Sequence, residues 1–260
     1  MHRERTVTVK NVTLGQGRPK VFVPITGATT ARLLARIDAL VGRPVDVVEW
    51  RADHFVRIAD VSEVVRTAGI LAERLASRLD GPPLLFTCRT YGEGGLAVLS
   101  SRTYTRVNIA VAESGTVDLL DVEYGRERGM VERIIAAAHE RGVPVITSSH
   151  DFHRTPPADE IITRLLEMQR IGADVCKVAV MPHSAGDVLT LLEATATVHE
   201  KYADRPLITM AMGGLGIVTR LAGQVFGSAA TFGMVGTPSA PGQIDADELD
   251  RILRTIERSL

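Results

Sequence analysis

Short apolar runs alternate along the whole chain with longer segments in which apolar residues recur at helical spacing. Eight of the short runs have the length and composition of buried parallel strands. They cover residues 21–25, 45–51, 84–89, 117–123, 144–150, 174–180, 206–212 and 230–234, and successive runs begin 24 to 39 residues apart. Each interval suits one strand, one helix and two loops. Eight such repeats predict an α/β fold, a (β/α)8 TIM barrel.

Three of the intervening segments show a clear helical stripe. In residues 158–174 apolar side chains recur about every four positions, and Gly172 follows the last turn as the expected end of the helix. Residues 131–142 and 187–202 repeat this pattern. Residues 6–14 instead predict an extra N-terminal β-hairpin, which we expect to close the barrel bottom.

An open doubly wound sheet is the competing fold. It usually carries a glycine-rich phosphate loop after its first strand. Here the first strand is followed by PITGATT at 24–30, which has no such loop, so the barrel is favoured. The chain also has no linker or low-complexity tract. We therefore expect residues 1–260 to form a single catalytic barrel domain.

Composition excludes several classes of protein. Thirty basic and 31 acidic residues give a net charge of −1, which argues against a nucleic-acid-binding or membrane-surface protein. Residues 221–244 carry no charge, but their glycines and prolines leave too few apolar residues for a membrane span. Two cysteines cannot form a disulfide scaffold, and the first 20 residues lack the apolar core of a secretory signal. These features favour a cytoplasmic enzyme or binding protein.

Polar residues gather where the predicted strands end. In a barrel of this type the active site lies at the C-terminal ends of the strands, and alternate side chains point inward. The residues at strand ends are Glu49, Arg51, Arg89, Asp121, Glu123 and His150. Lys177 lies within the sixth strand and Met210 and Met212 within the seventh, while Glu93 and Arg220 follow the third and seventh strands. Core packing alone does not require so many charges at one mouth.

Lys177 lies inside an otherwise apolar strand, between Val175 and Ala179 on the same face. A buried lysine loses solvation of its charged form, which makes the neutral amine available as a Schiff-base nucleophile. The alternative is a structural ion pair with Asp121 or Glu123. The residues alone leave both interpretations open.

His150 is the natural acid–base partner, because imidazole titrates near neutral pH. The alternative is a core histidine bonded to a backbone carbonyl. No metal-ligand spacing and no G-x-S-x-G motif occur, so we expect neither a metal site nor a serine triad, and no cofactor. Cys88 and Cys176 have outward positions and are expected to be inert core residues.

Three arginines indicate an anionic ligand. Arg51, Arg89 and Arg220 can bind a carboxylate through paired N–H groups. Ser239 and Gln243 lie on the uncharged loop GTPSAPGQ, which is either a lid over the site or a plain surface connection.

Taken in order, seven motifs resemble the type I 3-dehydroquinate dehydratase family over nearly the whole chain. They are EWRAD (49–53), FTCRTYGEGG (86–95), SSHDF (148–152), KVAVMP (177–182), MAMGGLGIVTR (210–220), FGSAATFG (226–233) and SAPGQI (239–244). The resemblance implies metal-free dehydration of 3-dehydroquinate to 3-dehydroshikimate, the third step of the shikimate pathway. It also implies a homodimer.

The resemblance further implies a role for each matching residue. Lys177 would form an imine with the ring ketone, His150 would move the protons, and Glu93 would orient His150. The groups that would bind substrate are Arg220 at the carboxylate, Glu49, Arg51 and Arg89 at hydroxyls and carboxylate, Ser239 and Gln243 on the closing loop, and Met212 as an apolar wall. Asp121 and Glu123 would support them. Trp50 stands where the family motif is expected to have leucine, and its outward position predicts altered packing without an effect on chemistry.

Two other functions fit parts of this pattern. A class I aldolase would use the same barrel and the same lysine imine, but it would cleave a carbon–carbon bond. A non-catalytic binding protein could retain the scaffold, although it would have no use for a buried reactive amine.

Overall fold

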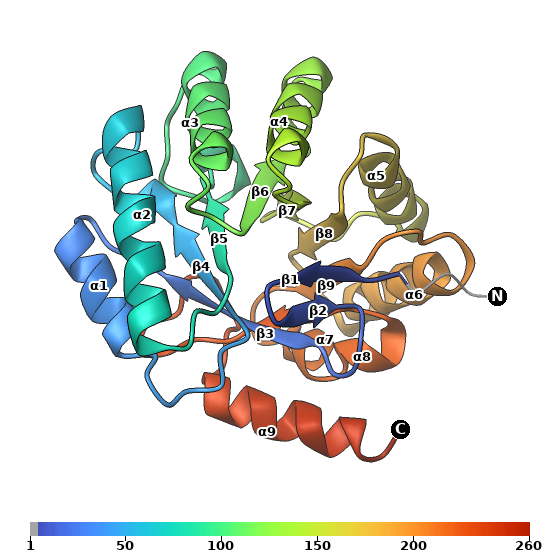
Figure 1. The fold of residues 1–260 in the computed structure, drawn as a ribbon. Coiled ribbons are helices and arrows are strands. Elements are labelled where there is room, and N and C mark those ends of the chain that lie inside the picture. The colour runs from blue at the N-terminus through green and yellow to red at the C-terminus, as the bar shows by residue number, and fades with distance from the viewer. Residues whose placement is uncertain (1–4) are drawn as a thin grey trace.

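Eight parallel strands form the wall of a barrel in the computed structural model, which describes residues 5–260 (Figure 1). The strands are β3 (Lys20–Ile25), β4 (Val47–Arg51), β5 (Leu84–Thr87), β6 (Leu119–Glu123), β7 (Val145–Asp151), β8 (Val175–Val180), β9 (Leu207–Ala211) and β10 (Ala230–Phe232). They pair in sequence order from β3 to β9, and β10 pairs with β3. A bridge between Leu207 and Ser228 closes the ring. The predicted barrel and its eight strand positions are confirmed.

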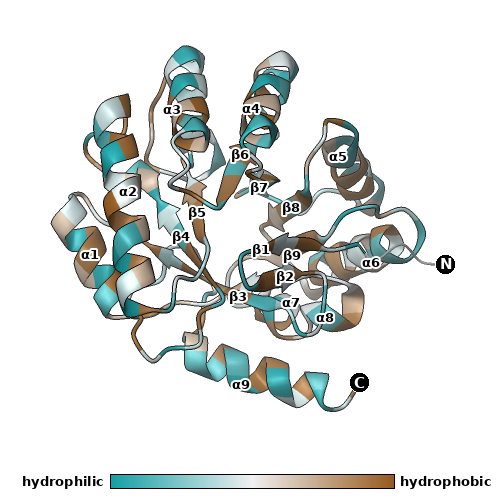
Figure 2. Cartoon of the chain, in the orientation of Figure 1, coloured by the Kyte–Doolittle hydropathy of each residue, from teal (hydrophilic) through white to brown (hydrophobic). Residues whose placement is uncertain are grey.

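Seven long helices surround the strands: α1 (Thr30–Asp38), α2 (Val61–Arg78), α3 (Ser101–Glu113), α4 (Arg128–Glu140), α5 (Ala158–Arg170), α6 (Ala185–Lys201) and α9 (Ala246–Glu257). Each has apolar residues on one side and hydrophilic residues on the other (Figure 2). Gly172 follows α5 with φ of 96°, a left-handed conformation that suits glycine, and its N–H donates to the Gln169 carbonyl. The three helices predicted from apolar periodicity are therefore present.

The segment after β9 departs from the regular repeat. It forms two short helices, α7 (Ile217–Leu221) and α8 (Gly223–Phe226), in place of one long helix. A Cβ atom at Gly216 would lie 2.1 Å from the Ala211 carbonyl oxygen, so only glycine allows the chain to turn this closely against the end of β9. The Thr219 hydroxyl then accepts a hydrogen bond from the Ala211 N–H at 2.9 Å. This turn holds the next residue, Arg220, beside the barrel mouth.

The N-terminal hairpin consists of β1 (Val7–Val9) and β2 (Val12–Leu14), which pair antiparallel. It lies across the barrel in Figure 1. Its buried residues pack against the inward residues near the strand starts, in a cluster of Val9, Val12, Leu14, Phe22, Val47, Leu85, Leu119, Ile146, Val175 and Ile208. The prediction that this hairpin closes the barrel bottom is confirmed.

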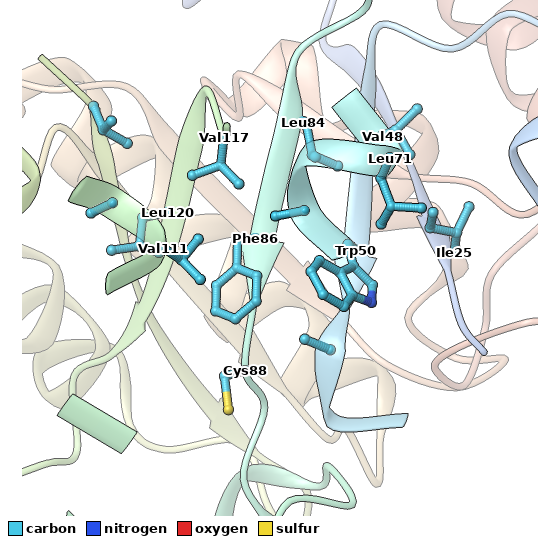
Figure 3. Close-up of a cluster of buried hydrophobic side chains, with 14 of the residues drawn as sticks. Ile25, Val48, Trp50, Leu71, Leu84, Phe86, Cys88, Val111, Val117 and Leu120 are labelled. Carbon is cyan, nitrogen blue, oxygen red and sulfur yellow. The ribbon is translucent and has the colours of Figure 1, made fainter. Parts of the chain in front are cut away.

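Outward-facing strand residues pack under the helices. Trp50 is fully buried and meets Phe55 and Phe86 edge-on, with ring centroids 5.9 and 5.4 Å apart. Figure 3 shows Trp50, Phe86 and Cys88 within this layer. Cys88 and Cys176 are both buried outside the barrel interior, and burial raises the pKa of each thiol. The outward positions predicted for these residues are correct.

Residues 221–244 form the end of α7, then α8, β10 and connecting loops. Within residues 5–260, no helix is long and apolar enough to cross a membrane.

Candidate active site

The inward side chains at the C-terminal ends of the strands line a cavity of about 150 Å³. This substrate cavity is lined by Glu49, Arg51, Arg89, Glu93, Gly94, His150, Phe152, Lys177, Ala179, Met210, Met212, Arg220, Phe232, Ser239, Ala240, Pro241 and Gln243. All the residues that the sequence singled out for catalysis or substrate binding are among them. The fold brings together residues that lie up to 194 positions apart in the chain.

Lys177 lies in the wall of this cavity and is 3% exposed. Its Nζ donates to Asp121 Oδ2 at 3.2 Å and lies 4.5 Å from the centroid of the Phe232 ring. Of the two carboxylates considered as ion-pair partners, the structure therefore selects Asp121. The ring face and the carboxylate both stabilise a positive charge at this nitrogen.

Arg89 organises the buried carboxylates behind Lys177. Its guanidinium donates to Asp121 at 2.6 Å, Glu93 at 3.3 Å and Glu123 at 3.4 Å. Burial opposes ionisation of Asp121, but the charges of Arg89 and Lys177 outweigh it and hold its pKa below the usual range. Asp121 is thus an ionised carboxylate in the barrel interior, shared by two cations.

His150 and Glu93 form a hydrogen-bonded pair, with His150 Nδ1 2.9 Å from Glu93 Oε2. Burial, together with the charges of Arg89, Lys177 and Arg51, lowers the pKa of His150 well below its usual value. Burial raises the pKa of Glu93 to about 8. His150 is consequently a neutral imidazole at neutral pH. Since Nδ1 is held by Glu93, Nε2 is the nitrogen left for a ligand.

Arg220 is a buried cation in the substrate cavity, 1% exposed. Its Nη2 donates to the Pro241 carbonyl at 3.2 Å, and Nη1 lies 3.5 Å from Met210 Sδ. Among residues 5–260 no carboxylate pairs with it, and burial lowers its pKa to about 10. An uncompensated buried cation of this kind favours an anionic ligand.

Four residues of the 236–243 loop, at positions 239–241 and 243, line the same cavity. Gln243 Oε1 accepts from the Ser239 N–H at 2.7 Å, which folds the loop back on itself. Arg51 Nη1 donates to the Ser239 carbonyl at 3.4 Å, and Arg220 holds Pro241. Two arginines that line the cavity therefore also form hydrogen bonds to this loop.

Comparison with known proteins assigns the chain that forms this cavity to a family. A sequence model described as type I 3-dehydroquinase matches residues 21–259. The chain belongs to the type I 3-dehydroquinase family. A 3-dehydroquinate dehydratase from Syntrophotalea carbinolica is 48% identical over 96% of this chain and 98% of its own length. One from Bacillus licheniformis is 46% identical over 99% of this chain and 100% of its own length.

A solved structure agrees with this assignment. The type I 3-dehydroquinate dehydratase from Clostridium difficile superposes with a TM-score of 0.95 at 42% identity, covering 99% of this chain and 100% of that chain. Membership of the type I 3-dehydroquinase family makes this chain a hydro-lyase of the shikimate pathway that dehydrates 3-dehydroquinate. The aldolase and the non-catalytic interpretations are therefore set aside.

Beyond the residues singled out from its sequence, this 3-dehydroquinase has a further buried carboxylate at the site. Asp53 accepts from Arg51 Nε at 2.8 Å and from Nη2 at 2.9 Å. It also accepts from the Leu96 N–H at 3.1 Å, in the loop that carries Glu93. Burial opposes ionisation of Asp53, but the bonds from Arg51 outweigh it and lower its pKa. Asp53 thus fixes Arg51 and the neighbouring loop together.

Two hydroxyl groups were also missed. Thr87 donates to Glu49 at 2.8 Å, and Ser148 donates to Asp121 at 2.7 Å while accepting from Arg89 at 3.0 Å. Both have the inward position of their strands, which the sequence pattern already indicated. Asp53 had no such signal, because it lies in a 3-10 turn (Ala52–His54) after β4, where strand alternation no longer applies.

Proposed function

We propose that this 3-dehydroquinase removes water through an imine formed between Lys177 and the substrate ketone. One observation carries the proposal: a buried lysine shares a small cavity with a neutral histidine and with a cation that has no carboxylate partner in the described part of the chain. These three groups match the needs of the reaction, namely a nucleophile, a base and an anchor for a carboxylate.

Imine formation is the first step. Lys177 gives up one ammonium proton and attacks the ketone carbon as the neutral amine, which forms a carbinolamine. The carbinolamine oxygen takes one proton from that nitrogen, receives the ammonium proton back and departs as water, so the positive charge resides on the imine nitrogen. Asp121, 3.2 Å from the lysine nitrogen before reaction, stabilises this charge. The protonated imine withdraws electrons more strongly than the ketone, so the adjacent C–H becomes more acidic. No metal ion or cofactor is needed for this step.

Elimination then proceeds with His150 in both proton transfers. Its neutral imidazole removes a proton from the carbon next to the imine, and the electron pair moves toward the imine nitrogen to form an enamine. The enamine expels the hydroxyl group, which takes the proton from His150 and leaves as water. Glu93 holds the ring through Nδ1 in both steps. A further water hydrolyses the product imine, which frees 3-dehydroshikimate and Lys177.

Substrate recognition follows from the charges around the cavity. Arg220 binds the substrate carboxylate, while Glu49, Arg51 and Arg89 contact ring hydroxyls and the carboxylate. Ser239 and Gln243 close over the ring, and Met212 forms an apolar wall beside the imine. The relative from Clostridium difficile is described with covalent modified comenic acid, which supports covalent chemistry with a small organic acid in this family.

Borohydride trapping tests the proposal. Incubation with 3-dehydroquinate and borohydride should add the mass of one reduced adduct, located by peptide mapping on Lys177. The Lys177→Ala variant should form no adduct and lose turnover, whereas Lys201→Ala, at an exposed lysine on α6, should behave as the unaltered protein. Absence of an adduct despite demonstrated substrate binding would remove the imine mechanism.

We further propose that residues 1–260 act as a single catalytic domain, that the protein works in the cytoplasm, and that it forms a homodimer. The family resemblance supports the dimer. Light scattering coupled to size-exclusion chromatography tests it directly, since a mass near 28.1 kDa would show a monomer.

A further inference from the structure

A second cavity of about 650 Å³ lies behind the pair formed by His150 and Glu93. This rear cavity is bounded by the loops after β5, β6 and β7, and Arg164 of α5 contributes to its wall. Tyr91 and Val98 stand at its rim, 76% and 84% exposed, so it opens to solvent. It shares only three residues with the substrate cavity: Glu93, His150 and Phe152. His150 and Glu93 thus form part of the wall between the substrate cavity and the rear cavity.

The two oxygens of Glu93 face different surroundings. Oε2 holds His150 Nδ1 at 2.9 Å and is 3.3 Å from Arg89. Oε1 faces Gly125, where an added Cβ would lie 3.4 Å from it. Gly125 lines the rear cavity and not the substrate cavity, and its φ lies outside the left-handed region, so the backbone does not require glycine there. The missing side chain leaves this edge of Glu93 open to the rear cavity.

The reaction needs a route for water, provided that it proceeds through the imine proposed above. One water leaves when the ketone becomes an imine, and a second leaves when the hydroxyl departs. One water must then enter to hydrolyse the product imine, so each cycle releases one water net. During all three events the ring is bonded to Lys177, and four residues of the 239–243 loop form part of the cavity wall. The second water forms at His150, which is itself in the shared wall.

We propose that the rear cavity is the route by which water leaves and enters the closed site, passing between His150, Glu93 and Phe152. Phe152 is suited to the boundary because its ring packs against the loop at Gly94, where an added Cβ would lie 2.2 Å from a ring carbon. The substrate mouth can then remain covered throughout the covalent steps. Water exchange and substrate exchange use separate openings.

Oxygen labelling tests this route. 3-Dehydroquinate labelled with 18O at the ketone is converted in a single turnover in unlabelled water, and the product ketone is analysed by mass spectrometry after a rapid quench. An open rear route carries the expelled labelled water away, so the product should retain little label. Trapped water would be reused for hydrolysis, and up to half of the label would then return. Label loss from free substrate without enzyme is subtracted.

Two variants close the rear cavity from different walls. Gly125→Leu places a side chain against Glu93, and Val98→Trp fills the rim without touching the acid–base pair. Both should raise label retention several-fold and slow hydrolysis of the product imine. Gly129→Leu is the matched control, since a Cβ there meets no atom within 4 Å, and it should retain as little label as the unaltered protein.

The outcomes separate this inference from the proposed function. Unchanged retention in both filled variants, or high retention already in the unaltered protein, would overturn the water route. Borohydride trapping is run on the same samples. If no adduct forms on Lys177 in the unaltered protein, the imine mechanism itself fails. If adducts form throughout and label retention does not respond, only the water route fails.

Discussion

The two ends of the barrel use the same strands for opposite purposes. At the N-terminal end, inward residues such as Leu119 and Ile146 pack against the hairpin in an apolar cluster. At the C-terminal end, inward residues two to four positions later on the same strands are Asp121 and His150. A shift of two residues along a strand therefore separates a position that stabilises the fold from one that serves the chemistry.

The difference shows how the fold tolerates so many buried charges. Charges at the mouth have partners supplied by neighbouring strands and by the turns that follow strands, as Arg89 has in Asp121, Glu93 and Glu123. Arg220 is the exception, with neither a carboxylate partner nor a bond to its Nε among the residues described. Burial of apolar side chains at the N-terminal end of the barrel offsets the free-energy cost of burying charged groups at the C-terminal end.

The largest expected effect lies at the open end. His150→Ala should lower kcat by about 10²–10⁴-fold, the usual contribution of a general acid–base residue. Substrate should still bind and the free energy of unfolding should change little, because His150 lies at the mouth and outside the apolar cluster. Steady-state kinetics and urea denaturation measure both quantities. A variant that loses binding yet keeps its kcat would contradict the assigned role.

The closed end should respond in the opposite way. Leu14→Ala removes a fully buried side chain of the hairpin and should lower the free energy of unfolding by about 2–5 kcal/mol. The kcat of the folded protein should stay unchanged, because the hairpin lies at the far end from the cavity. Leu189→Ala, at a side chain that is 65% exposed, is the control for stability. A large loss of kcat with intact stability would show that the two ends are not independent.

A positioning effect is expected from Asp53→Asn. Arg51 keeps its place but loses the charge of its partner, which corresponds to roughly tenfold in KM for a hydrogen bond between charged groups. The kcat should fall less than KM rises, since Arg51 contacts no reacting atom. Asp60→Asn, at a partly exposed carboxylate that caps α2 outside the cavity lining, should leave KM unchanged. Equal effects of the two variants would mean that Asp53 has only a general structural role.

The last expected effect concerns pH. Burial raises the pKa of Glu93 from 4.5 to about 8, so the folded state holds this proton more tightly than the unfolded state. The resulting stability is present below the lower value and is lost as the pH rises through about 8. Glu93→Gln cannot titrate, so its urea midpoint should fall less over that range than the midpoint of the unaltered protein or of Glu140→Gln on the surface. Parallel pH curves would contradict the shift.

Much of this site could be predicted because strand alternation is local. The positions of Lys177, His150 and Arg89 follow from counting residues in pairs along strands whose apolar runs are plain. The hairpin and the outward position of Trp50 follow from the same pattern. Partner choice is not local, however. Whether Lys177 pairs with Asp121 or Glu123 depends on the stagger between strands, which the pattern of one strand does not contain.

Features outside regular elements were the least predictable. Asp53 points at Arg51 from a 3-10 turn, and the bond from Leu96 depends on the path of a loop. The two short helices after β9 arise from the close turn at Gly216, which apolar periodicity does not report. The rear cavity is likewise formed by three loops. The contact between this cavity and Glu93 is recognised only from the short distance between Glu93 Oε1 and a Cβ atom added at Gly125.

The closure of the ring gives the barrel a seam. Six residue pairs join β7 to β8. Among the residues described, β9 is joined to the segment just before β10 by one isolated bridge, between Leu207 and Ser228. Amides along this seam have the fewest ladder partners, so local opening costs least there. Arg220 and the loop over the cavity both belong to the chain that flanks the seam. The chain that flanks the seam, where substrate must enter, can therefore open locally while the remaining strands stay paired.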